Sequence, residues 1–148
     1  MKENYKKELK KKLEEYLKDE KHEVFFDALE TFIRLEFLEA KDFKKQVTHH
    51  LHSLSECGSW VSVGDCHLRE MAYTDVLIQS IKIGILDEKR EVDYWLGHAK
   101  FLSRYHYELV VVTMIEEGFL DEGEVKKILD KSFSARIFEA ALKKRMFE

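Results

Sequence analysis

The chain has 148 residues, of which 45% are hydrophobic and 36% are charged, and its net charge is −4. This length suits one domain with a real core, and this composition excludes a disordered chain. The sequence contains no proline. Because proline breaks helices, its absence favours long helices joined by short turns. We therefore predict a single all-α domain over residues 1–148.

The charges are unevenly distributed along the chain. Residues 25–124 carry 10 basic and 19 acidic residues, whereas residues 125–148 carry 7 basic and 3 acidic ones. The acidic body disfavours general nucleic-acid binding, which needs a broad basic surface. The basic C-terminal segment suits an acidic partner or the acidic body of a second copy. The favoured alternative is that these lysines and arginines simply suit the C-terminal end of a helix.

The N-terminus is charged and lacks the apolar segment of a signal peptide. No apolar run approaches the ~18 residues that are needed to span a membrane. We expect a cytoplasmic protein without membrane association, in which Cys57 and Cys66 are reduced thiols.

Apolar residues at helical spacing predict helices over residues 3–18, 22–39 and about 43–55, the last with Asp42 as its N-cap. Residues 56–66 interrupt the pattern with two glycines and two serines. A loop there exposes apolar side chains unless they meet a partner. The interaction candidates are Trp60, Val61 and Val63. A helix over about 66–84 follows.

The most apolar stretch runs from residue 91 to residue 117. As one helix it carries apolar residues over an arc of roughly 240° at 100° per residue, so we expect partners on most of its sides. Its β-branched residues 110–113 favour a strand, but they lie inside a longer helical period. Helices over about 122–131 and 133–147 close the chain. We predict an irregular bundle of six to seven helices around helix 91–117.

Two similar corners bracket this central helix. Residues 81–88 and 115–122 each place a glycine at a helix end, then an apolar pair, then an aspartate, Asp87 or Asp121, that can cap the next helix. Solenoids usually need three or more repeats, and the nearest third candidate, residues 35–42, lacks the glycine. We therefore predict two corners rather than a tetratricopeptide-like array.

A group of histidines and cysteines suggests a zinc or iron site. The metal candidates are His49, His52, Glu56, Cys57, Cys66 and His67, and His50 lies among them. His49, His52 and Glu56 share one helix face, but Lys45 in its middle would repel a cation. The Cys57-x8-Cys66 spacing is not that of a standard zinc knuckle. A solvated histidine face with two ordinary thiols is the favoured alternative.

Two further histidines, His98 and His106, lie on the apolar arc of the central helix. With Tyr105 and Trp95 they are the candidate ligand-binding residues, because a histidine in an apolar setting prefers its neutral form and can act as a base or anchor. The favoured alternative is a core histidine bonded to a backbone carbonyl or a tyrosine hydroxyl.

No catalytic motif is present. The sequence has no Glu-x-x-His di-iron motif, no phosphate-cradling glycine loop and no nucleophile elbow. We expect a non-catalytic helical protein-protein interaction module, as a homodimer or a subunit of a complex, with no cofactor. The alternatives are a metal- or small-ligand-binding protein using the histidines, with zinc or iron as the metal, and a nucleic-acid-binding accessory protein.

Overall fold

The structure of the protein is a computed structural model, which describes residues 2–56 and 63–148. Its described residues form eight α-helices and two short 3-10 helices and contain no strand, which confirms the all-α class. The first half holds α1 (Lys2–Lys18), α2 (His22–Arg34), η1 (Ala40–Phe43), α3 (Lys44–Ser55) and α4 (Val63–Ile83). The second half holds α5 (Lys89–Gly97), η2 (His98–Phe101), α6 (Arg104–Glu116), α7 (Glu122–Lys131) and α8 (Ala135–Lys143).

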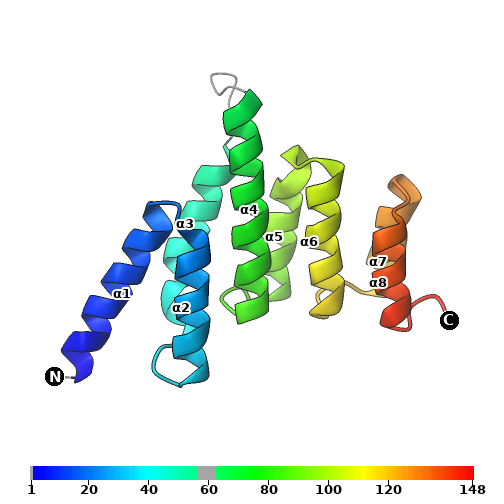
Figure 1. Cartoon of the computed structure of the whole chain (residues 1–148). Coiled ribbons are helices and arrows are strands. Elements are labelled where there is room, and N and C mark those ends of the chain that lie inside the picture. The colour runs from blue at the N-terminus through cyan, green and yellow to red at the C-terminus, as the bar shows by residue number, and fades with distance from the viewer. Residues whose placement is uncertain (1, 57–62) are drawn as a thin grey trace.

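Successive helices pack as antiparallel pairs, and the pairs follow one another across the molecule (Figure 1). Each odd-numbered helix contacts the even-numbered helix that follows it. The even helices also contact one another in the order α2, α4, α6 and α8, while α3 contacts α1 and η2. The two termini therefore lie at opposite ends of the row (Figure 1).

The two predicted corners, 81–88 and 115–122, are two of the turns in this row of helix pairs. The pairwise packing of helices extends over the whole described chain. The two similar glycine-containing segments occur only in its second half. The pairs differ in length, since α4 has 21 residues and α5 has 9. The bundle is therefore irregular, as predicted.

The core runs between the two layers of helices. Its largest fully buried side chains include Phe25 of α2, Phe43 of η1, Tyr73 of α4 and Met114 of α6. Phe25 and Phe43 meet edge to face, with ring centroids 5.7 Å apart. Such aromatic pairs add to the free energy gained from apolar burial, so they join the first two helix pairs firmly.

The two predicted corners are present, and each begins with a left-handed glycine. Gly84 has φ 93° and Gly118 has φ 80°. This conformation costs glycine little and strains other residues. Asp121 also caps α7 as predicted, because its side chain accepts a hydrogen bond from the Glu124 amide while Glu124 bonds back to the Asp121 amide.

The other two aspartates that were predicted as N-caps, Asp87 and Asp42, do not cap a helix in the structure. Glu88, not Asp87, occupies the N-cap position of α5, and the Asp87 carboxylate accepts a hydrogen bond from Lys44 at 3.0 Å instead. Asp42 lies within η1 and pairs with Lys10 at 2.9 Å. In both places a lysine from another helix binds the carboxylate and takes it away from the helix end.

The predicted helix 91–117 is divided in two. α5 ends at Gly97, η2 follows, and Leu102 has extended backbone angles (φ −69°, ψ 146°) before α6 starts at Arg104. Leu102 is only 8% exposed, and the Ser103 amide donates to the Glu70 carboxylate of α4. Burial and this hydrogen bond stabilise the break, so the chain turns back along α4 where helical periodicity predicted that it would continue.

Among the described residues, no helix is long and apolar enough to cross a membrane.

Candidate functional site

All seven histidines of the chain lie near one edge of the helix row. Odd-numbered helices run towards the upper edge in Figure 1 and even-numbered ones run away from it. The second half of α3, the first turns of α2, α4 and α6, and η2 therefore meet at that edge. The histidines there are His22, His49, His50, His52, His67, His98 and His106.

Six of these histidines form three pairs between helices. The rings of His22 in α2 and His50 in α3 have centroids 4.8 Å apart. His52 and His98 have ring centroids 6.3 Å apart, and those of His67 and His106 are 6.2 Å apart. Each pair joins two different helices, so we call this edge the histidine edge.

The His22–His50 pair has the closest contact. The two Nε2 atoms are 2.7 Å apart, which is a hydrogen bond between one ring that carries the proton and one that does not. His22 is only 7% exposed. Burial lowers the pKa of His22, and burial together with the neighbouring His22 lowers the pKa of His50 to about 4. Both rings are therefore neutral at physiological pH.

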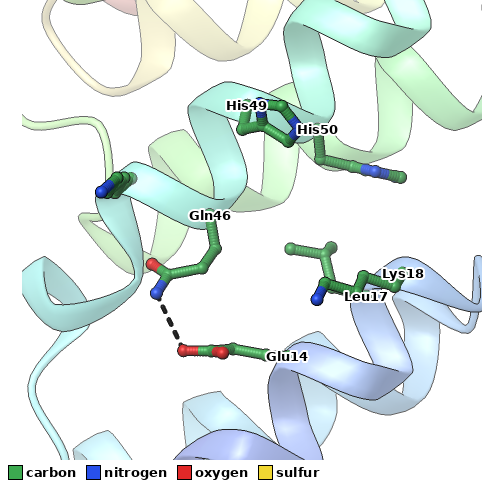
Figure 2. A pocket seen from close by; sticks show the side chains of 7 residues that line it. Glu14, Leu17, Lys18, Gln46, His49 and His50 are labelled. Carbon is green, nitrogen blue, oxygen red and sulfur yellow. Dashed lines mark hydrogen bonds between the residues drawn. The ribbon is translucent and has the colours of Figure 1, made fainter.

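A cavity of about 270 Å³ lies beside His50, between α1 and α3 (Figure 2). Gln46 crosses it and donates a hydrogen bond to the Glu14 carboxylate at 2.8 Å. A second cavity of about 370 Å³ shares Lys18, His49 and His50 with the first. The first cavity extends back along α1 and α3 to Glu14 and Lys45, whereas the second extends to Ser53 and Leu54 at the end of α3.

The predicted ligand-binding residues of the central helix fall into two groups, with ring centroids 5.8 Å apart for Trp95 and His98 and 5.4 Å apart for Tyr105 and His106. His98 is exposed, and its Nδ1 atom contacts the Tyr94 carbonyl at 2.9 Å. His106 is half-buried, with a buried Nδ1 atom that has no hydrogen-bond partner among the described residues. Tyr105 is exposed beneath Arg136, whereas Trp95 is packed in the core. Division of helix 91–117 places His98 and His106 in different elements.

The predicted metal-binding residues His49 and His52 have different surroundings. His52 faces Trp95, with ring centroids 5.5 Å apart, whereas His49 lines the cavities beside α1. Within the described parts of the chain, the one trio of metal-ligating side chains close enough to share an ion is Asp87, Glu88 and Glu91. Lys44 already binds two of these carboxylates, at 3.0 and 2.9 Å, and its ammonium group opposes a cation there.

The predicted interaction residues Trp60 and Val61 lie outside the described residues, as does the metal candidate Cys57. Val63 and Cys66 belong to the first turn of α4.

A larger groove of about 1000 Å³ opens on the C-terminal half of the molecule, between η2 and α6 on one side and α7 and α8 on the other. Leu102, Ile128 and Ile137 contribute its apolar surface, and Tyr107 is half-buried among its walls. Burial raises the pKa of the Tyr107 phenol, which therefore stays protonated. We call this feature the α6–α7 groove.

Cations dominate the rim of the α6–α7 groove. It is lined by Lys100, Arg104, Lys127 and Lys131 and by two acidic residues, Glu108 and Asp130. Both acidic residues are already engaged. Glu108 pairs with Arg104 at 3.0 Å, and Asp130 pairs with Lys126 at 3.1 Å. The unpaired charge of the groove is therefore positive.

Sequence reasoning missed His22 and the groove. His22 stands alone at the start of a helix, and nothing in its neighbourhood along the chain indicates that His50 lies against it. Lys100 and Lys131 are 31 positions apart, and only the fold of four helical elements brings them to one rim. The excess of basic residues after residue 124 was the one signal that pointed to this part of the molecule.

Comparisons of the chain with protein-family models, with curated proteins and with solved structures each find no match.

Proposed function

We propose that this protein is a non-catalytic helical interaction module that binds a partner protein through the α6–α7 groove. The observation that carries this proposal is the groove itself, which combines an apolar floor with a rim of unpaired cations. Interfaces with a buried apolar centre and a polar rim are typical of protein recognition.

The row of helix pairs supports the same proposal. Arrays of stacked helix pairs present extended surfaces on which partners bind, while each pair is held by its neighbours. Here α7 packs mainly on α8, which leaves its other flank as a wall of the groove. Exposed Tyr105 and Phe133, at 52% and 60%, lie close in sequence to the groove residues Arg104 and Ser134.

A photo-crosslinking amino acid at the position of Ser132, inside the groove, tests this function in the cells that make the protein. We expect a crosslinked product of discrete mass from this position. The same amino acid at the position of Lys7, on the exposed side of α1 at the other end of the row, should give none. Identical products from both positions, or no product from either, would count against the proposal.

The histidine edge supports a second candidate function, transition-metal binding. Neutral imidazole nitrogens are good ligands for zinc, copper and nickel, and the Nε2 atoms of His22 and His50 lie 2.7 Å apart. Both atoms would bind an ion only with the ring protons on Nδ1, so the ion would replace the hydrogen bond between the rings. Titration of untagged protein with Co²⁺ tests this candidate by the visible absorption of the bound ion. His50→Gln should abolish that absorption, and His49→Gln serves as the control. Spectra that are unchanged by His50→Gln would exclude the pair as ligands.

A further inference from the structure

We propose that the partner segment held in the α6–α7 groove is an acidic amphipathic helix. This inference rests on the proposed interaction function, and it specifies the chemistry of the partner.

The charge of the groove points to an acidic ligand. Lys100, Lys127 and Lys131 are exposed on its rim, and in the described part of the chain none of them lies within salt-bridge distance of a carboxylate. The two acidic residues of the rim are neutralised by intramolecular pairs. Carboxylates of a bound segment would therefore meet three unpaired ammonium groups, which favours association and its correct orientation.

The floor of the groove points to a ligand that is also apolar on one face. Leu102 and Ile137 are 8% and 1% exposed, whereas Ile128 on α7, which lines the same groove, is half-buried. Apolar side chains that cover Ile128 gain free energy in proportion to the area removed from water. A purely acidic tail would leave the exposed part of Ile128 hydrated.

The walls of the groove favour a helix over an extended peptide. They consist of helices and the α7–α8 loop, so they offer no strand edge that could pair with an extended backbone. A helix satisfies its own backbone hydrogen bonds and presents apolar anchors at positions i, i+3, i+4 and i+7. Single-stranded nucleic acid fits less well, because its bases stack on exposed aromatic rings, and Tyr107, the aromatic residue of the groove lining, is half-buried.

Binding of a fluorescein-labelled model helix, with leucine on one face and glutamate on the other, tests the proposal by fluorescence anisotropy. We expect the full-length protein to bind this peptide and to lose affinity as salt rises. The double variant Lys127→Glu/Lys131→Glu should bind about tenfold more weakly, since two favourable charge contacts become repulsive. Ile128→Asn should weaken binding with no change in its salt dependence.

The matched control is the double variant Lys143→Glu/Lys144→Glu, which changes the net charge by the same amount at the C-terminal end of α8. Both control lysines lie outside the groove lining and neither pairs with a groove residue among those that the structure describes, so the affinity should change less than about twofold. Circular dichroism of all variants confirms that each is folded.

Several outcomes would overturn the inference. They are equal weakening by the two double variants, absence of peptide binding at low salt, and equal binding of a scrambled peptide of the same composition. Tighter, competing binding of a single-stranded oligonucleotide would assign the groove to nucleic acid. If the protein sediments in a concentration-dependent way and Lys127→Glu/Lys131→Glu abolishes this behaviour, the α6–α7 groove binds a second copy of the chain. If the protein does not bind the model peptide but still gives the crosslinked product from position 132, the proposed interaction function stands and the partner segment is not an acidic amphipathic helix.

Discussion

The Nε2 atoms of His22 and His50 lie 2.7 Å apart, which joins the first two helix pairs through a hydrogen bond between imidazoles. The contact requires at least one neutral ring, and burial disfavours protonation of both. The junction between α2 and α3 therefore depends on pH.

We expect the free energy of unfolding to fall as pH is lowered from 6.5 towards 4. The folded-state pKa of both histidines lies below the ordinary 6.5, and that of His50 is about 4. In this interval the unfolded chain binds more protons than the folded chain, so stability is complete above pH 6.5 and declines below it. His50→Gln should reduce the decline by about 1–2 kcal/mol, a range that allows for the partial exposure of the ring. Urea unfolding of the wild type and the variant at a series of pH values measures the free energy of unfolding and its decline.

His49→Gln is the control for this experiment, because His49 is the adjacent residue of α3 and is exposed. It should retain most of the decline of the wild type, because His49 is the smallest of the three causes that lower the pKa of His50. An unchanged decline in His50→Gln would show that other groups cause the pH dependence.

The two glycine corners differ in how the next helix is capped, and this difference is measurable. Asp121→Ala removes the capping box of α7 and should lower the free energy of unfolding by about 1 kcal/mol. Asp87→Ala removes only a surface contact with Lys44 and should cost less than about 0.5 kcal/mol. Chemical denaturation of both variants tests the comparison, and equal losses would contradict the assignment of Asp121 as the cap.

Substitution of Gly118 should destabilise the protein, whereas substitution of Gly97 should not. Gly118 has φ 80°, so an alanine there is strained even though its Cβ meets no atom. We expect Gly118→Ala to cost about 1 kcal/mol or more. Gly97 has helical angles (φ −59°, ψ −33°) and open space around its Cα. Gly97→Ala should therefore be neutral or stabilise by up to about 1 kcal/mol. Thermal unfolding measures the stability of both variants. A loss of stability in Gly97→Ala would contradict the expected difference between the two glycines.

The buried hydroxyl of Tyr73 should contribute to the packing of α4 on α5. It donates to the Trp95 carbonyl at 2.7 Å, and the side chain is fully buried. Burial raises the pKa of this phenol, so the donor proton is retained. Tyr73→Phe leaves the carbonyl unpaired and should cost about 1–2 kcal/mol in the free energy of unfolding. Tyr5→Phe, at an exposed position, is the control and should cost almost nothing. Similar effects of both substitutions would argue against the hydrogen bond.

Local physics determined much of the fold from the sequence. α1 and α7 lie within a residue of their predicted bounds, because their apolar spacing and end residues are local signals. Ser134 is the N-cap of α8 through a similarly local contact, because its side chain accepts a hydrogen bond from the Ile137 amide. The segment 22–39 ends earlier than predicted, at Arg34, and Glu36 follows with φ 59°. The apolar residues after Arg34 lie in a turn and pack on the core. Apolar periodicity alone does not distinguish such a turn from a further helical turn.

The sequence by itself determined the all-α class, the two glycine corners and the absence of a known catalytic motif, since each depends on residues that are near neighbours in the chain. Tertiary structure alone decided where helix 91–117 is broken, because Leu102 and Ser103 take their conformation from packing on α4 and a hydrogen bond to Glu70. It also decided which histidines meet and which lysines surround the α6–α7 groove. Those contacts join residues of different helices, and a helical period contains no information about which helices lie side by side.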